Sequence, residues 1–426
     1  MPETNREIAA QRTRTAYHRG IANGVLFAIG VAFVDPITVL PTFVSRLTDS
    51  EIAIGLVAAI GTSGWFLPQL LVASYIQSRP HKLPVYVFAA YLRGVSLLLM
   101  IPIIYVLARS LPIVALGGFI FGYALYSFSA GLSGPVFLDV VAKTVPGNRL
   151  GAFFGHRQFW GGLGAIGSGM LVRFILSEQG PAFPVSYCLL FGLALAFFAP
   201  GWALFTTVYE PPGKVERAQP LLSFLRSAPT VVREHRAYRL LLISRLLTGC
   251  TSIALPFYII YCRRFLGVPE EAVGTYLAIQ MLGSVALIPV WAFLNDRRGP
   301  RTLLVAVAGL SLAVPSLAVL GVLLAGSPGV ARGIFGAVFF PVAAVGGGSF
   351  MGYTNYLFAI APEERRPLYI GVQNTLFAVT AFLPLLGGVV VGLASFQVLF
   401  VVAAIMGLLG LMATIVLPEA APRNRR

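Results

Sequence analysis

The sequence contains few charged residues for its length. Lys, Arg, Asp and Glu make up 11% of the 426 residues, whereas hydrophobic residues make up 57%. A soluble globular domain has about 25% charged residues, so this composition excludes an ordinary soluble enzyme. A disordered chain is excluded as well, because such chains are poor in hydrophobic residues. The composition predicts a protein that crosses the membrane several times.

Three further features that are rare or absent limit the classes of function. The chain has only three cysteines, at positions 188, 250 and 262, which are too far apart to indicate a disulfide framework or a metal cage. It has no GxxxxGK[ST] loop, so ATP is not expected to drive it directly. The sixteen acidic residues are scattered, whereas an intramembrane transferase would need clustered carboxylates or a metal set. We predict no enzyme activity, no cofactor and no metal site.

Long apolar stretches are what the sequence has in abundance. A helix needs about twenty residues to cross about 30 Å of hydrocarbon. The stretches are continuously apolar, whereas barrel strands alternate over about ten residues, so helices are expected. Twelve stretches lie near 20–46, 52–77, 83–108, 112–142, 149–177, 183–209, 238–265, 270–294, 301–325, 331–360, 367–393 and 395–417.

The charge balance predicts the orientation. The net charge of +15 comes from short basic runs between apolar stretches, and cytoplasmic loops of membrane proteins collect such runs. The basic residues form no groove with stacking aromatics, so we expect no nucleic-acid partner. If both termini are cytoplasmic, most Lys and Arg residues fall on the inner side. We therefore predict a multi-pass protein of the cell membrane with both termini in the cytoplasm.

The chain contains an internal repeat. Residues 51–64 align without gaps on 270–283, and residues 145–158 align on 361–374 with nearly the same offset. Two pseudo-symmetric six-helix bundles are therefore expected, residues 1–209 and 238–426, joined by a cytoplasmic linker at 210–237. Duplicated halves of this kind can rock about a central site and expose it to each side in turn. Because the repeat supplies its own internal interface, we expect a monomer.

One loop carries a family resemblance. The segment AFLNDRRGPR at 292–301 resembles the signature loop of the major facilitator superfamily, whereas the corresponding first-half loop, ASYIQSRPHK at 73–82, is degenerate. The resemblance implies the major facilitator fold, with spans one, four, seven and ten around a central cavity. It also implies that the loop is a latch, in which a carboxylate meets arginines across a glycine turn. The latch residues are Asp296, Arg297, Arg298, Gly299 and Arg301.

Two charged residues lie deep within predicted spans of the first half. Ionisable residues in membrane helices are costly and mark pathways or internal ion pairs. Asp35 is about fifteen residues into the first span, and Arg93 is about ten residues into the third. We predict that they take part in proton coupling and translocation, with Asp35 as the proton carrier. A fixed ion pair between Asp35 and Arg93 is the alternative.

A second polar set lies nearer the inner ends of the spans. Asp139 is expected to pair with Arg157, with Arg79 or Lys82, or with Arg245, as part of an inner gate. A substrate-binding role for Arg157 or Arg245 is the alternative. The candidate residues of this cavity or inner gate are Asp139, Arg157, Gln158, Arg245, Asn355 and Asn374.

Together these features predict a secondary active transporter that works by alternating access. Few charges and many aromatic residues favour proton-coupled export of a lipophilic or amphipathic small molecule. Uptake of a small organic metabolite is the alternative within transporters. A lipid flippase or a channel is the alternative from a different class. The partners expected are the substrate, protons or another coupling ion, and the lipid bilayer.

Overall fold

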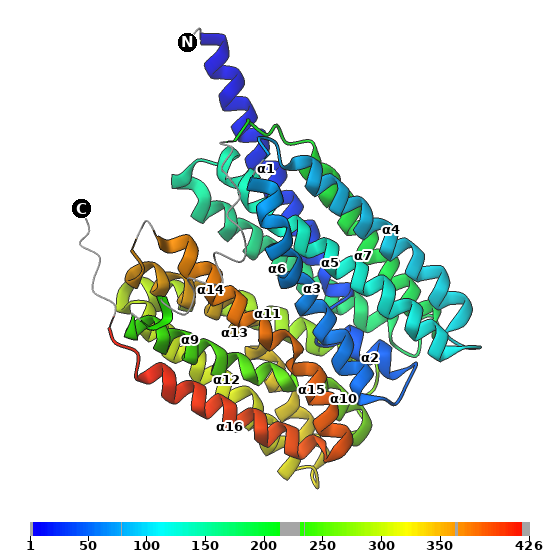
Figure 1. Ribbon diagram of the computed structural model, residues 1–426. Coiled ribbons are helices and arrows are strands. Elements are labelled where there is room, and N and C mark those ends of the chain that lie inside the picture. The colour runs from blue at the N-terminus through cyan, green and yellow to red at the C-terminus, as the bar shows by residue number, and fades with distance from the viewer. Residues whose placement is uncertain (1–2, 78, 214–230, 234, 363–364, 420–426) are drawn as a thin grey trace. The chain divides into compact units, whose positions relative to one another are not determined.

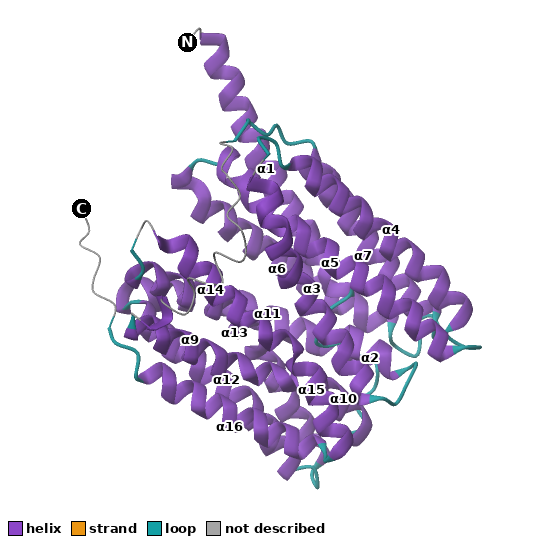
Figure 2. Ribbon diagram, in the orientation of Figure 1, coloured by secondary structure: helices purple, strands orange, loops and turns teal. Residues whose placement is uncertain are grey.

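The computed structural model describes the chain except for residues 1–2, 78, 214–230, 234, 363–364 and 420–426. The described residues form helices and no strands (Figures 1 and 2). They make twelve helical segments, some of them interrupted, which confirms the predicted all-helical fold. Ten segments are long and apolar enough to cross a membrane. The other two contain α1 and α6, which carry arginines among their apolar residues.

The helices of the first half keep the predicted order. They are α1 (Glu3–Phe33), α2 (Val39–Ser45), α3 (Glu51–Gln77), α4 (Leu83–Leu107), α5 (Pro112–Thr144), the 3-10 turn η1 (Gly147–Arg149), α6 (Leu150–Ile175) and α7 (Val185–Thr206).

The second half repeats this pattern after the segment 214–230, which lies outside the described residues. Its elements are α9 (Arg236–Gly249), η2 (Cys250–Ala254), α10 (Leu255–Phe265), α11 (Ala272–Arg298), α12 (Pro300–Leu323), α13 (Pro328–Ile360), α14 (Arg366–Ala378), η4 (Val379–Phe382), α15 (Leu383–Leu393) and α16 (Phe396–Ile415).

Three of the spanning segments are interrupted near prolines. Proline has no N–H to donate and disfavours helical geometry at the residue before it. Asp35 and Pro36 lie in the gap between α1 and α2, and Pro256 and Pro384 lie in the first turns of α10 and α15. The interruptions therefore fall in the first, seventh and eleventh spans. Broken helices of this kind are typical of transporters, where unwound backbone lines a pathway.

The chain folds into two compact units. The first comprises residues 1–35 and 60–220, and the second comprises residues 36–59 and 221–426. The segment 36–59, which contains α2 and the start of α3, therefore packs with helices of the second half. Most of the predicted linker 210–237 lies outside the described residues, so its role stays a prediction.

Small residues allow close helix packing inside the first unit. A Cβ added at Gly24 of α1 would overlap the side chain of Arg157 on α6, and one added at Gly161 would lie 2.8 Å from the Cβ of Ala28. Gly131 of α5 similarly faces the carbonyl oxygen of Gly64 on α3. Close approach through small residues is how membrane helices gain packing contacts.

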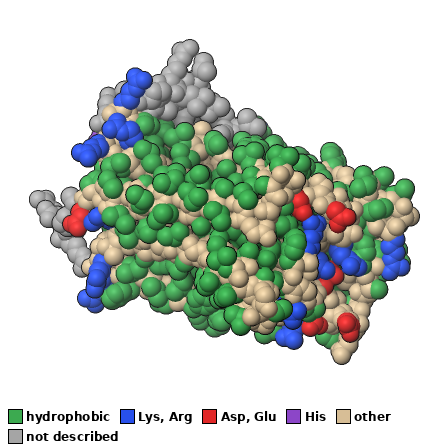
Figure 3. Space-filling model, turned by 90° about the horizontal axis from the view of Figure 1, so that it is seen from below, with side chains coloured by type: hydrophobic (Ala, Val, Ile, Leu, Met, Phe, Trp, Pro, Cys, Tyr) green, Lys and Arg blue, Asp and Glu red, His purple; other side chains and the backbone are tan. Residues whose placement is uncertain are grey.

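The surface carries large exposed hydrophobic side chains. Phe121 on α5 is 74% exposed and Leu323 on α12 is 75% exposed. The face shown in Figure 3 is mainly hydrophobic, with Lys, Arg, Asp and Glu gathered toward its ends. Extended apolar surface of this kind marks contact with lipid or another apolar partner, as expected for helices that span a bilayer.

Candidate functional site

Arg93 lies in an aromatic cage inside the first unit. Its side chain on α4 is 3% exposed, and its guanidinium carbon lies 4.7 Å from the ring centre of Trp202 and 5.0 Å from that of Tyr126. The rings of Phe27 and Phe198 also face it, at 5.3 and 5.9 Å. Aromatic faces attract cations, and more strongly when water is excluded. The cage therefore holds a buried positive charge among four helices.

The polar contacts of Arg93 are with hydroxyl groups. Its Nη1 and Nη2 lie 3.5 Å from Ser133 Oγ and 3.4 Å from the Tyr126 hydroxyl. A fixed ion pair between Asp35 and Arg93 stays an alternative prediction. Burial of a guanidinium beside neutral groups is unusual and indicates a functional demand.

Asp35 is buried at the interruption between α1 and α2, where it is 3% exposed. Its carboxylate interacts electrostatically with Tyr123 on α5. The ring of Tyr123 stacks on that of Tyr126, with centres 6.1 Å apart, and the Tyr126 hydroxyl is the one near Arg93. Tyr123 is therefore within electrostatic reach of the predicted proton carrier, and its stacking partner Tyr126 lies beside the caged arginine.

Arg157 on α6 binds α1. Its Nη1 donates to the carbonyl oxygen of Gly20 and, at 3.2 Å, to Asn23 Oδ1. The rings of Phe137 and Phe153 flank the guanidinium at 4.5 and 5.5 Å. The predicted pairing of Asp139 with Arg157 is therefore wrong for this structure, because Arg157 turns toward the backbone of α1.

Arg245 on α9 makes a similar contact in the second unit. Its Nη1 donates to Asn374 Oδ1 on α14 at 3.3 Å, and the rings of Phe377 and Tyr353 lie 4.4 and 5.6 Å from its guanidinium carbon. Both Arg157 and Arg245 are only partly buried. The structure therefore brings Arg245 and Asn374 together, whereas Gln158 is exposed on α6.

Asp139 belongs to an ion network at the predicted inner end of the first unit. Its two oxygens lie 2.6 Å from Lys82 Nζ and 2.7 Å from Lys143 Nζ. Of the alternatives for Asp139, the structure thus shows the contact with Lys82. Glu210 joins the network, since its carboxylate lies 2.8 Å from Lys143 Nζ and accepts the backbone N–H groups of Lys82 and Leu83 at 2.7–2.9 Å. A carboxylate at a helix N-terminus caps free N–H groups and matches the helix dipole.

The signature loop forms the turn between α11 and α12. Gly299 has φ +87°, a left-handed conformation that glycine adopts without strain. Arg301 donates to the carbonyl oxygen of Ile415 at 2.8 Å and lies 3.5 Å from Glu419. Asp296 accepts from Asn295 at 3.0 Å and, among the described residues, forms no ion pair with Arg297, Arg298 or Arg301. Asn295 in turn accepts from Asn355 on α13 at 2.9 Å.

A cluster of ion pairs joins the segment 36–59 to the second half. Arg264 at the end of α10 pairs with Glu51 at the start of α3, and Arg46 lies 3.9 Å from Glu270. Arg263 adds a contact with Glu270 at 3.4 Å. We call these five residues the loop-end cluster, because they lie in predicted outer loops or at the helix ends beside them.

Close backbone packing accompanies the loop-end cluster. A Cβ added at Gly55 would overlap the carbonyl oxygen of Pro384, and one added at Gly388 would overlap that of Glu51. The start of α3 and the helix α15 therefore approach each other through glycines. Ion pairs and tight packing together hold residues 36–59 on the second half.

Comparison with known proteins identifies the chain. A sequence profile described as Major Facilitator Superfamily matches residues 240–426. No curated protein matches the chain. The fold is similar to that of a mutant of the nucleoside transporter NupG, with 14% identity, a TM-score of 0.70, and 95% of this chain and 100% of the other covered. The second half of the chain therefore matches the major facilitator superfamily, and the whole chain has the fold of solved transporters.

Two further solved structures have the same fold. A bacterial homologue of the iron transporter ferroportin, in its inward-facing state, is 15% identical, with a TM-score of 0.73 and coverage of 94% of the transporter and 98% of the homologue. An auto-inhibited peptide transporter of the POT family is 12% identical, with a TM-score of 0.68 and coverage of 96% and 97%. At these identities the similarity supports the fold and leaves the substrate open.

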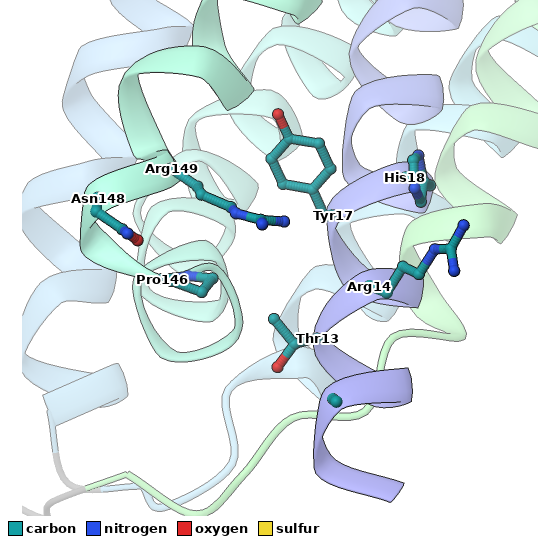
Figure 4. Close-up of a pocket in the computed structure, with 8 residues that line it drawn as sticks. Thr13, Arg14, Tyr17, His18, Pro146, Asn148 and Arg149 are labelled. Atoms are coloured by element: carbon teal, nitrogen blue, oxygen red, sulfur yellow. The ribbon is translucent and has the colours of Figure 1, made fainter. Parts of the chain in front are cut away.

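The protein has a cavity with two arginines in its first unit, between the N-terminal part of α1 and the turn before α6 (Figure 4). Its volume is about 710 Å³. The guanidinium of Arg149 points toward Tyr17 across it. Among the described residues that line it, two are arginines and none is acidic. Its lining residues are Ala10, Thr13, Arg14, Tyr17, His18, Pro146, Asn148 and Arg149.

Sequence reasoning missed two groups of residues in the transporter. Glu210 was counted with the linker, although it follows α7 directly and its side chain is buried in the ion network. The loop-end cluster was missed as well, although Glu51 and Glu270 occupy matching places in the repeat. The repeat was therefore the signal that could have indicated this cluster. Among the described residues no three His, Cys, Asp or Glu side chains come together as a metal site.

Proposed function

We propose that the transporter exports a lipophilic or amphipathic small molecule in exchange for protons, by alternating access. We further propose that it works as a monomer in the cell membrane, with both termini in the cytoplasm and no nucleic-acid partner. The membrane location and transport of a small molecule are supported by the match of residues 240–426 to the family and by the apolar helices. The observation that supports the proton coupling is the burial of Asp35 and of the caged Arg93 within the same unit.

The proposed coupling follows from charge balance in a medium of low dielectric constant. A buried cation and a buried carboxylate in the same unit offset each other over several ångströms, because screening is weak there. When Asp35 takes up a proton, the positive charge of Arg93 loses that compensation. The change is felt by Tyr126 on α5 and by Trp202 on α7, which both contact the guanidinium. Protonation can therefore shift the packing of several helices at once.

The character of the substrate is inferred from the side chains near these charges. Phe27, which is partly exposed beside the caged Arg93, suits a molecule with apolar surface. The solved transporters of similar fold act on nucleosides, iron and peptides. Because these are so different, the fold does not select among them, and the side chains of this transporter carry the proposal.

The test is efflux of lipophilic dyes and antibiotics from cells that lack their own pumps. We expect the wild type to export members of the panel, and a proton uncoupler to abolish export. The Asp35→Asn variant should reach the membrane and lose export, while the control Asp49→Asn, at a fully exposed loop position, should keep it. Export that persists in Asp35→Asn would contradict the coupling role. A panel in which nothing is exported, together with uptake of a metabolite, would replace export by import.

A further inference from the structure

Arg157 in the first unit and Arg245 in the second each lie within a spanning helix where no described carboxylate contacts them. Among the described residues, the polar contacts of Arg157 are the Gly20 carbonyl and Asn23, and that of Arg245 is Asn374. By contrast, the carboxylates of Asp139 and Glu210 each form an ion pair with a lysine. The protein thus leaves these two positive charges uncompensated, although charge within a membrane is costly.

The two arginines occupy related places. In the first unit the arginine of α6 binds an asparagine of α1, so the bond joins the fifth span to the first. In the second unit the arginine belongs to α9 and the asparagine to α14, so the bond joins the seventh span to the eleventh. The repeat relates the first span to the seventh and the fifth span to the eleventh. The arginine is on the fifth span in the first unit and on the seventh span in the second, so the arginine and the asparagine have exchanged spans. Both halves therefore present a guanidinium where their first and fifth helices meet.

A structural bridge between helices does not require this charge. Asn355 on α13 donates a hydrogen bond of 2.9 Å to Asn295 on α11, and both side-chain amides are neutral. A hydrogen bond between two neutral amides would likewise connect α1 to α6, or α9 to α14, without placing a positive charge within a spanning helix. The choice of arginine therefore indicates a demand for positive charge beyond helix packing.

The geometry leaves donors available on both guanidiniums. Arginine carries five N–H donors in a planar fork that matches an oxyanion. In each case the protein bonds described above use Nη1 alone. The flanking rings cover the faces of the guanidinium and leave its edge, and both side chains are partly exposed. Each arginine can therefore donate to a carboxylate, sulfonate or phosphate of a ligand.

We propose that Arg157 in the first unit and Arg245 in the second are each a binding site for the oxyanion group of a transported molecule, so that the substrate class is an amphipathic organic anion. This inference rests on the proposed function, because it assumes that the transported molecule is amphipathic. Asn23 and Asn374 are positioning residues that hold the two guanidiniums in place. The partly exposed rings beside the guanidiniums, Phe137 for Arg157 and Phe377 for Arg245, contact the apolar part of the molecule bound there.

The test uses three probes that share one ring system and differ in charge: 2-naphthoate, 2-naphthylmethanol and 2-naphthylmethylammonium. Binding to the full-length protein in detergent is measured by the shift in its thermal unfolding midpoint over a range of probe concentrations. We expect naphthoate to stabilise the wild type at lower concentration than the neutral and cationic probes. If naphthoate stabilises it no better than they do, the inference is overturned.

Variants assign the effect to the two arginines. Loss of a hydrogen bond to a charged group corresponds to about a tenfold to hundredfold loss of affinity. We expect Arg157→Gln and Arg245→Gln to weaken naphthoate binding by that factor and to leave naphthylmethanol binding within about twofold. Arg157→Lys should lie between Gln and wild type, because it keeps the charge and loses the fork. Arg173→Gln on α6 and Arg239→Gln on α9 are matched controls at exposed positions.

The neutral probe separates a binding role from general damage. A variant that merely disturbs packing lowers the affinity for all three probes together, and that result would overturn the inference. The proposed function fails in a different way, through absence of export in cells. Export of cations and neutral molecules only, unaffected by Arg157→Gln and Arg245→Gln, would leave the export proposal intact and refute the anion class.

Discussion

Replacement of Glu210 by Gln should destabilise the transporter far more than the same change at Glu419. Both residues follow the last helix of their half and lie near the start of its third helix, where Glu210 binds residues 82 and 83 and Glu419 lies near Arg301. Their environments differ, since the Glu210 side chain is 3% exposed and that of Glu419 is 87% exposed. The repeat thus supplies a matched control.

The size of the effect follows from the contacts. Glu210 accepts two backbone N–H groups and the ammonium of Lys143. Hydrogen bonds to a charged group contribute about 1.5–3 kcal/mol each. Glutamine keeps one acceptor oxygen but presents an NH2 group to the remaining donors, so at least one such bond and the ion pair are lost. Because Asp139 still neutralises Lys143, we expect a net loss of about 3 kcal/mol. The exposed Glu419 pair contributes no more than about 0.5 kcal/mol.

The assay is thermal unfolding of the purified protein in detergent, followed by circular dichroism. We expect Glu210→Gln to lower the midpoint by several degrees and Glu419→Gln to leave it near the wild-type value. Added salt should not reduce the Glu210 effect, because screening acts weakly on buried groups. Equal shifts for the two variants, or a Glu210 effect that disappears in salt, would refute the reasoning from burial.

Two further predictions concern packing and ion pairs. A double-mutant cycle with Glu51→Gln and Arg264→Gln should give a coupling energy of about 1 kcal/mol or more in thermal unfolding, because the two side chains are partly buried in one network; additive single effects would mean that the pair contributes nothing. Gly283→Ala on α11 should impair folding, because its Cβ would overlap the Phe340 carbonyl oxygen, whereas Gly347→Ala on α13 meets open space and should be tolerated. Yield of monodisperse protein measures the difference, and equal yields would show that α11 and α13 can move apart.

Much of the architecture was predictable from the sequence. Continuous hydrophobic stretches locate the spanning helices, because about twenty apolar residues have few other stable arrangements. The interruption of the first span could be inferred from Pro36, since proline breaks the helical hydrogen-bond ladder. The repeat predicted which helices correspond, and the signature loop forms the expected turn at Gly299.

The partners of the polar side chains could not be predicted in the same way. Asp139 and Arg157 lie at similar depths in the predicted spans. Whether their side chains face each other depends on how α5 and α6 are rotated about their axes, and hydropathy does not determine that rotation. In the structure Arg157 turns to Asn23 and Asp139 turns to Lys82. Glu210 could not be predicted from the sequence, because a glutamate beside two prolines is typical of a solvated linker. Only the fold places its carboxylate next to the backbone N–H groups at the start of α4.

The loop-end cluster has a consequence for the origin of the fold. Arg46 of the first repeat meets Glu270 of the second, and Arg264 of the second meets Glu51 of the first. The two glutamates are counterparts in the alignment, and Arg46 and Arg264 lie at nearly equivalent positions. A six-helix chain with one such arginine and one such glutamate would therefore form both bonds at once by pairing with a second copy of itself, as any two-fold interface requires. Once the two copies are fused into one chain, a residue of one ion pair can change without the same change in the other pair. Arg263, which lies beside Glu270, is an example of such a difference.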